Sequence, residues 1–426
     1  MSTSSSQVNP RARWHIDTGE RGKLALAAGT YFLLLCGYYM LRSLREAMAL
    51  AAGREHIPLL FTVTFVVMMA LLPGYWWVVA RVRRDRLLAV LYLPVVVIIG
   101  ALATFAGRDH VPPHLAALYF VLVTSLNLFI VSVFWSVMAD TWRPEAAKRL
   151  FGMVAAGGSL GALTGPAFNA LFVERLGATG TIYIACTLLA VAVATGIAAQ
   201  RMRVSAPQSA ADPRTAVGGR AIDDLKRLAR SPYLLAIAGF IVVGQWLGAF
   251  MYNEQARYVE AAHAELTQRA ALFARIDLAS NVLALLAQGV IVGWLTVRGG
   301  VRATLTAMWA LAAASFALLA LVPTGAVLLA TQIVRRAGDY GLFKPSREML
   351  FTVLAPASKF KSKSLLDTVL QRGADSVGNG LYLLIAPLGL AGIAGLCASA
   401  CVLLILCSRW LGAAFDRQES QASSSL

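Results

Sequence analysis

The sequence predicts an all-α polytopic membrane protein in which twelve transmembrane helices form two six-helix bundles. Three observations support this prediction. Of the 426 residues, 58% are hydrophobic and only 14% are charged, whereas a typical soluble domain has about 25% charged residues. The apolar residues form long blocks that reach the roughly 20 residues a membrane-spanning helix needs. A polar stretch at 201–230 divides these blocks evenly, with six before it and six after it.

The N-terminal bundle is expected over residues 23–200, after a polar and disordered cytoplasmic segment at 1–22. The first apolar run lacks the short hydrophobic region and small-residue cleavage site of a signal peptide, so it is expected to remain as a helix. The six spans of this bundle are expected at 23–50, 57–80, 87–106, 114–139, 150–173 and 180–200.

The C-terminal bundle is expected over residues 231–410, after a cytoplasmic linker at 201–230. The first part of the linker is rich in Ala, Ser, Pro and Gly, which favours a flexible chain. Residues 411–426 have low complexity and are expected to form a disordered cytoplasmic tail. Two halves of this kind are typical of secondary transporters. The six spans of the second bundle are expected at 231–256, 270–297, 302–322, 324–350, 365–387 and 388–410.

The net charge of +16 is explained by membrane topology. If the N-terminus is cytoplasmic, 25 of the 38 Lys and Arg residues fall in segments on the cytoplasmic side, and only five fall in loops on the other side. The positive-inside rule predicts this asymmetry. We therefore expect a multi-pass protein of the inner (cytoplasmic) membrane with both termini cytoplasmic. Its surroundings are then the lipid bilayer, and no nucleic-acid partner is expected.

The sequence gives no indication of an enzyme. Its five cysteines lie in apolar spans, without the CxxC spacing of a metal site, and are expected to act as small buried hydrophobic residues. A nucleotide P-loop and a nucleophile motif are both missing from the sequence. We expect no catalytic residue, no metal and no cofactor.

Charged residues inside the predicted spans are the candidates for a binding site. Intramembrane ionisable residues are costly and usually mark a pathway. Eight basic and eight acidic residues lie in or at the ends of spans, and seven of the eight bases are arginine. The guanidinium fork binds phosphate or carboxylate bidentately, which favours an anionic substrate. The alternative is a set of internal salt bridges that lock helices together. The basic residues are Arg42, Arg45, Arg275, Arg335, Arg336, Lys344, Arg347 and Arg372, and the acidic residues are Glu46, Asp140, Glu254, Asp277, Asp339, Glu348, Asp367 and Asp375.

The spacing of these charges predicts shared helix faces. Arg335 and Asp339 are four residues apart in the tenth span, and Asp367, Gln371 and Asp375 repeat every fourth residue in the eleventh. Pro345 is expected to bend the tenth span just after Lys344. In the first span, Arg42, Arg45 and Glu46 can cluster on one side of the helix.

Two further features concern small and aromatic residues. Gly157, Gly161 and Gly165 recur every fourth residue in the fifth span, which predicts a face where another helix backbone approaches closely. The aromatic residues of the charged spans are candidates for stacking on a nucleobase, although packing or interfacial anchoring is their more common role. These residues are Tyr38, Tyr39, Trp246, Tyr252 and Tyr340.

Three stretches of the sequence are distinctive: "YYMLRSLREAM" (Tyr38–Met48), "KRLFGMVAAGGSLGALTGP" (Lys148–Pro166) and "FKPSREMLFTVLAPASKFKSKSLLDTVLQRGADSVG" (Phe343–Gly378). Together they resemble the ATP/ADP translocase family, a group of nucleotide exchangers related to the major facilitator superfamily. The run "GALTGP" within the second is also similar to the first half of a motif of antiporters in that superfamily. The resemblance implies nucleotide exchange, with basic residues contacting phosphates and acids taking part in coupling. At the positions that match the family motifs, the resemblance implies such substrate-binding or coupling roles. These positions are Arg42, Arg45, Glu46, Lys344, Arg347, Asp367, Arg372 and Asp375.

The leading functional prediction is a monomeric, alternating-access antiporter of nucleotides (ATP/ADP-like) or related phosphorylated anions. One alternative is a proton-coupled transporter of another organic anion or a drug, in which Asp339, Asp375 or Glu254 titrates. Another is a transporter-like membrane sensor or scaffold without flux. The predicted substrate-binding residues are Tyr38, Arg42, Arg45, Glu46, Arg335, Asp339, Lys344, Arg347, Asp367, Arg372 and Asp375.

Overall fold

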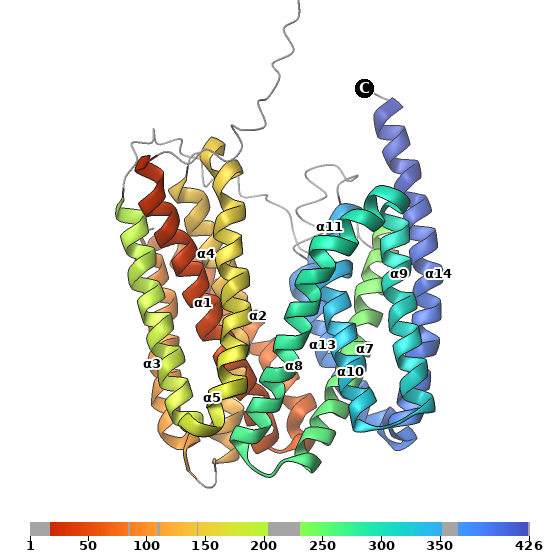
Figure 1. The fold of residues 1–426 in the computed structure, drawn as a ribbon, viewed down its shortest axis with the longest axis horizontal. Coiled ribbons are helices and arrows are strands. Elements are labelled where there is room, and N and C mark those ends of the chain that lie inside the picture. Colours follow the sequence, from red (N-terminus) through yellow and green to blue (C-terminus); the bar gives the residue numbers. More distant parts are fainter. Residues whose placement is uncertain are drawn as a thin grey trace, which may run out of the picture. The chain divides into compact units, whose positions relative to one another are not determined.

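The computed structural model describes helices along almost all of the predicted spans (Figure 1). The described residues are 18–83, 86–108, 111–142, 144–202, 231–351 and 365–424. Most of the predicted N-terminal segment and linker therefore lies outside the described residues. The chain divides into two compact units, one of residues 1–46 and 68–209 and the other of residues 47–67 and 210–426.

The described part of the first unit is built from five long helical elements. The break at Gly177, where φ is 72°, separates the two spans that the sequence predicts within the last of them. Glycine adopts this backbone conformation without steric cost. Helices α1 and α2 each contribute residues to both units. The elements are α1 (Thr18–Ala51), α2 (Ile57–Arg81), α3 (Leu87–Ala106), α4 (Pro113–Thr141) and α5 (Pro144–Arg201).

The predicted glycine face of the fifth span packs against α1. A Cβ atom at Gly157, Gly161 or Gly165 would overlap a backbone carbonyl of α1, namely that of Ala28, Phe32 or Cys36 respectively. Only glycine allows two helix backbones to approach this closely. The close-packing interpretation of this motif is therefore confirmed.

Among the described residues, the second unit has seven α-helices and several short irregular helical turns. Helix α9 packs along α14, and α7 packs along α13 (Figure 1). The rings of Phe240, Trp309 and Phe343 meet in its core, with centroids 5.3–5.9 Å apart. The helices are α7 (Pro232–Ala262), α8 (Leu266–Leu286), α9 (Gly293–Leu321), α10 (Gly325–Gly338), α11 (Lys344–Leu350), α13 (Gln371–Ile385) and α14 (Gly389–Ser424). The turns are the π-helical η4 (Ala287–Val292), η5 (Asp339–Phe343) and η6 (Leu365–Leu370), and the 3₁₀-helical η2 (Arg54–His56) and η7 (Ala386–Leu388).

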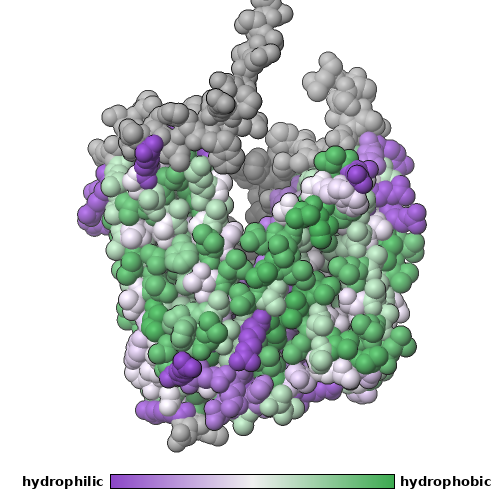
Figure 2. Space-filling view, in the orientation of Figure 1, coloured by the Kyte–Doolittle hydropathy of each residue, from purple (hydrophilic) through white to green (hydrophobic). Residues whose placement is uncertain are grey.

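The all-α membrane fold is confirmed. Among the described residues, nine helical stretches are long and apolar enough to cross a membrane. Two of them, Arg149–Arg201 and Gln371–Arg417, are interrupted by glycines of positive φ and contain two predicted spans each. The tenth predicted span corresponds to α10, η5 and α11, whose many charges keep it out of the nine. On the visible surface, hydrophobic residues form a broad band with hydrophilic residues toward the helix ends (Figure 2).

Two boundaries differ from the sequence prediction. Helix α14 continues to Ser424 instead of giving way to a disordered tail after residue 410, because Leu411, Ala414 and Phe415 are buried in the core of the unit at helical spacing. The irregular turn of the tenth span is η5, just before Lys344 and not after it. Pro345 has no N–H to donate to the carbonyl four residues earlier, so the turn preceding it widens.

Candidate functional site

In the first unit, Arg45 is held by groups on two helices. Its guanidinium forms an ion pair with Glu46, the next residue of α1. It also donates a hydrogen bond to Thr124 Oγ1 of α4 over 3.4 Å and lies over the ring of Phe120, 5.3 Å from its centroid. Glu46 is itself buried. Arg45 and Glu46 are thus neutralised largely by each other, which lowers the cost of placing both charges inside a membrane span.

Arg42 and Tyr38 belong to an aromatic group one turn earlier on α1. The guanidinium of Arg42 lies over the ring of Tyr39, 5.4 Å from its centroid. Tyr39 in turn makes an edge-to-face contact with Tyr38, with centroids 5.5 Å apart. Tyr38 is buried, with 3% of its surface exposed. The two rings therefore pack on each other, and that of Tyr39 also supports Arg42.

In the second unit, Asp375 is surrounded by other predicted site residues. Its Oδ1 accepts a hydrogen bond from Gln245 of α7 over 2.9 Å, and its Oδ2 lies 3.6 Å from Nη1 of Arg372. The charges of Asp339, Lys344 and Arg335 also act on this carboxylate. We call Arg335, Asp339, Lys344, Arg372 and Asp375 the C-terminal charge cluster. The structure thus brings together five predicted residues from α10, η5, α11 and α13.

Arg335 is fixed by amide side chains. Its Nε donates to Oε1 of Gln332 over 3.0 Å, and Gln332 donates to Oε1 of Gln255 on α7 over 2.8 Å. Its Nη1 lies 3.3 Å from the position that a Cβ would take at Gly248, so glycine there makes room for the guanidinium. In the part of the chain that the structure describes, no carboxylate lies within 4.0 Å of Arg335.

Lys344 has a similar environment. Its Nζ lies over the ring of Tyr340, 4.0 Å from the centroid, and no carboxylate of the described residues is within 4.0 Å of it. A ring face attracts a cation through its quadrupole but does not neutralise it. The cluster has three cations and two carboxylates, which leaves one net positive charge. Such an arrangement suits an anion better than a neutral ligand.

Two predicted residues lie elsewhere. Arg347 is buried, and its guanidinium lies 5.7 Å from the ring centroid of Phe343, one of the core aromatics of the unit. Asp367 falls in η6, but its side chain lies outside the described residues.

Sequence reasoning missed the polar residues that cross-link α7 to its neighbours. Besides Gln245 and Gln255, Asn253 donates to Oδ1 of Asn379 on α13 over 2.7 Å. Positions 245, 249 and 253 recur every fourth residue, so two amides, Gln245 and Asn253, on one face of α7 were the available signal. Their partners lie about 130 positions away in the sequence, and helical spacing gives no information about such contacts.

Other embedded charges form local locks, as the salt-bridge alternative predicts. Asp277 of α8 and Arg336 of α10 pair over 2.6 Å, with side chains 3% and 14% exposed. Glu254, which is 1% exposed, pairs with Arg257 over 2.6 Å and accepts a hydrogen bond from Tyr382 over 2.8 Å. Asp277–Arg336 and Glu254–Arg257 are therefore closed pairs, whereas the C-terminal charge cluster is less completely paired among the described residues.

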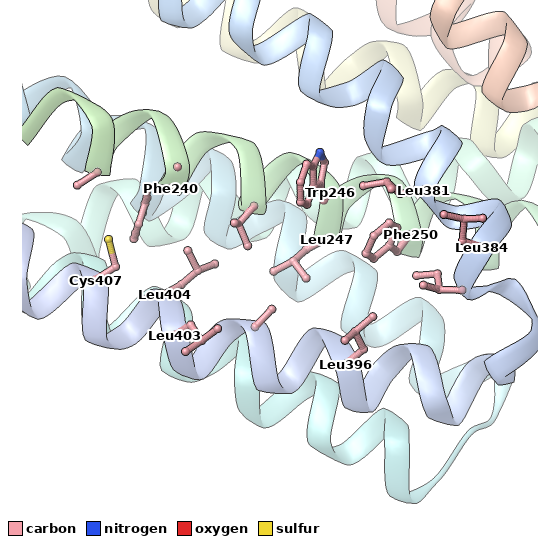
Figure 3. Close-up of a pocket in the computed structure, with 15 residues that line it drawn as sticks. Phe240, Trp246, Leu247, Phe250, Leu381, Leu384, Leu396, Leu403, Leu404 and Cys407 are labelled. Atoms are coloured by element: carbon pink, nitrogen blue, oxygen red, sulfur yellow. The ribbon is translucent and has the colours of Figure 1, made fainter. Parts of the chain in front are cut away.

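An apolar cavity of about 550 Å³ lies between α7, α13 and α14 (Figure 3). Trp246, a candidate for stacking on a nucleobase, lines this cavity. Since its lining has no charged side chain, the cavity cannot neutralise an anion, and it shares no lining residue with the C-terminal charge cluster. The lining residues are Ala236, Gly239, Phe240, Val243, Trp246, Leu247, Phe250, Leu381, Leu384, Ile385, Leu396, Ala400, Leu403, Leu404 and Cys407.

Residues 27–343, about three quarters of the chain, match the family model of the Major Facilitator Superfamily. The chain belongs to the Major Facilitator Superfamily. It is therefore a membrane transporter and not an enzyme. No curated protein matches the sequence. Among the described residues, no group of three or more His, Cys, Asp or Glu side chains could hold a metal ion.

Solved transporter structures share the fold. The nucleoside transporter NupG is 16% identical with a TM-score of 0.58, and the match covers 93% of this chain and 99% of that one. A POT family transporter in complex with 5-aminolevulinic acid is 13% identical with a TM-score of 0.64, and the match covers 92% of this chain and 96% of that one. A peptide transporter POT in complex with sulfate is 16% identical with a TM-score of 0.62, and the match covers 93% of this chain and 95% of that one. At these identities the likeness shows the superfamily fold alone, so the substrate must be argued from the residues of this chain.

Proposed function

We propose that this superfamily member exchanges nucleotides, of the ATP/ADP type, or related phosphorylated anions by alternating access. The observation that carries the proposal is the state of Arg335 and Lys344. Both cations act on the same carboxylate, Asp375, yet neither has a carboxylate within 4.0 Å among the described residues. Placing a cation in a membrane span is costly when no carboxylate lies close to it, and a bound anion would offset that cost.

The proposed chemistry divides the work between the two cations and their acids. Arg335 presents its two terminal amino groups as a fork for phosphate oxygens, because its Nε is already bound to Gln332. Lys344 acts as a point charge. Arg372 lies 3.6 Å from Asp375, a loose pair that an incoming phosphate can loosen further. Asp339 and Asp375 balance part of the positive charge when no substrate is bound.

The remaining predicted residues are included in the proposal. On the first unit, Arg42 and Arg45 are the proposed phosphate contacts, with Glu46 and Tyr38 holding them in place. On the second unit, Arg347 and Asp367 are the remaining proposed participants. We also propose an inner-membrane location with both termini cytoplasmic, from the distribution of basic residues.

The test is an exchange assay with purified protein in liposomes. Liposomes loaded with unlabelled ADP should take up labelled ATP or ADP, and liposomes without internal nucleotide should take up far less, because an empty carrier reorients slowly. A panel of nucleotides and sugar phosphates then identifies the substrate. Uptake of no member of the panel above that of protein-free liposomes would rule out the proposal.

A second candidate function is proton-coupled transport of another organic anion or a drug. It is favoured by Asp375, whose carboxylate has one hydrogen bond and one loose ion pair among the described residues. A proton could therefore neutralise this carboxylate in place of a closer cation. A pH gradient alone should then drive uptake into liposomes that contain no substrate. Nucleotide exchange without proton coupling should not respond to that gradient.

A further inference from the structure

A small basic pocket lies between α9 and α14, away from the C-terminal charge cluster. Its volume is about 460 Å³. It contains two guanidinium groups, one hydroxyl group and small side chains. The lining residues are Gly299, Arg302, Ala303, Thr306, Ala307 and Arg409.

The two arginines are held together by a close helix approach. A Cβ atom at Gly412 would overlap the Cβ of Arg302, so α14 reaches α9 at this point because residue 412 is glycine. Arg409 precedes Gly412 by three residues and therefore lies on the same side of α14. Gly300, with φ of 64°, breaks the helix two residues before Arg302. Arg302 thus stands at the start of the straight part of α9, facing Arg409.

The polar groups of the pocket have few partners among the described residues. Arg302 and Arg409 are exposed, and no carboxylate of the described residues lies within 4.0 Å of either. The hydroxyl oxygen of Thr306 is buried, and it has no hydrogen-bond partner in the part of the chain that the structure describes. A bound group that accepts a hydrogen bond would satisfy this hydroxyl.

The pocket lies where the membrane-spanning parts of α9 and α14 end. The indoles of Trp294 and Trp410 flank it in sequence and are 54% and 44% exposed, as is common for tryptophan at a membrane interface. Hydrophilic residues gather over the upper end of α9 and α14 in Figure 2, above the hydrophobic band. A ligand in this pocket would therefore meet the head-group layer of the bilayer.

We propose that Arg302, Thr306 and Arg409 bind the phosphate of an anionic phospholipid. The two guanidinium groups can together donate four hydrogen bonds to phosphate oxygens, and the Thr306 hydroxyl can donate one more. Basic pockets between transmembrane helices at the membrane surface are suited to such head groups. The acyl chains would lie along the exposed apolar side chains of α14, among them Leu403 and Leu406.

The test measures lipid binding to the full-length protein in detergent, by native mass spectrometry and by thermal stability. The probes are phosphatidylglycerol, phosphatidylcholine, glycerol phosphate and inorganic phosphate. We expect phosphatidylglycerol to bind and to stabilise the wild-type protein. The Arg302→Gln/Arg409→Gln variant should bind it roughly tenfold more weakly, and Thr306→Val should weaken it by a smaller factor.

The matched control is Arg298→Gln. Arg298 is exposed on the same helix end, but its guanidinium lies over the ring of Trp294, 4.8 Å from the centroid, and outside the pocket. Equal loss of binding in this variant would show nonspecific attraction to surface charge and overturn the proposal. Equal binding of phosphatidylcholine would overturn it as well. Stabilisation by glycerol phosphate or inorganic phosphate as large as that by phosphatidylglycerol would assign the pocket to a soluble anion instead of a lipid. None of these measurements depends on nucleotide exchange, so they test the lipid site independently of the proposed function.

Discussion

The charged groups of the two units differ in how their cations are neutralised. On α1, Arg45 has Glu46 as its ion-pair partner and the Thr124 hydroxyl as a further acceptor. In the second unit, Arg335 has an amide oxygen and Lys344 has an aromatic ring, and neither has a carboxylate within 4.0 Å among the described residues. Both groups lie inside predicted membrane spans.

Under the proposed function, this difference separates ion pairs that stabilise the fold from cations of the C-terminal charge cluster that bind the substrate. A closed pair such as Asp277–Arg336 balances its own desolvation and holds two helices together. A cation with no carboxylate partner among the described residues, such as Arg335, does not have its desolvation offset by any of them, and its presence in a span favours a functional role. The following substitutions test this division, in order of expected effect.

The largest effect is expected on stability when a closed pair is opened. Asp277→Asn leaves the guanidinium of Arg336, only 14% exposed, without its carboxylate. The free energy of unfolding should fall by about 3–5 kcal/mol, as measured by denaturation in detergent. The double variant Asp277→Asn/Arg336→Gln removes the unpaired charge and should recover much of the loss. Unchanged stability in the single variant would show that this pair is not a lock.

The next effect is expected on transport when an open cation is removed. Arg335→Gln should lower nucleotide uptake in liposomes by about 100-fold, or about 2.7 kcal/mol, while leaving the thermal stability near that of the wild type. Arg335→Lys keeps the charge but loses the fork, so its uptake should be intermediate. If Arg335→Gln instead destabilised the protein and kept its uptake per folded molecule, Arg335 would belong with the closed pairs.

A smaller effect is expected for Arg42 in the first unit. Its guanidinium lies over Tyr39, and Arg42→Ala should lower uptake by at least about tenfold if Arg42 also contacts the substrate. Arg42→Lys is the control that keeps the charge. Wild-type uptake by Arg42→Ala would give this end of α1 a structural role and confine the substrate contacts to the second unit.

The fold could be predicted from sequence because membrane spans are set by local composition. The third span, predicted at 87–106, coincides with α3, whose ends follow the apolar run. The end of α14 could not be predicted in this way, because the polar residues after 410 hide the tertiary packing of Leu411, Ala414 and Phe415.

The candidate site could be predicted only in part, for a related reason. The four-residue spacing of Arg335 and Asp339 predicts a shared helix face and favours a direct pair, but none forms within 4.0 Å in the structure. The π-helical turn that begins at Asp339 departs from regular helical spacing. Gln332 takes the Nε hydrogen bond instead. The hydrogen bond from Gln245 to Asp375 joins two helices, and a contact of this kind cannot be predicted from spacing in a single sequence.

The smallest predicted effect compares the aromatic supports of the two units directly. Lys344 lies 4.0 Å from the ring centroid of Tyr340, whereas Arg42 lies 5.4 Å from that of Tyr39. A cation–π contact contributes roughly 0.5–1 kcal/mol at partly exposed sites. Tyr340→Leu should therefore raise the KM for the exchanged nucleotide about three- to fivefold, and Tyr39→Leu should raise it about twofold or less. The Phe variants keep each ring and should match the wild type. Both substitutions replace a tyrosine ring by leucine, so their effects on KM can be compared directly. A larger effect at Tyr39 would mean that Arg42 depends on its ring more than Lys344 does, and the proposed difference between the two groups would be reversed.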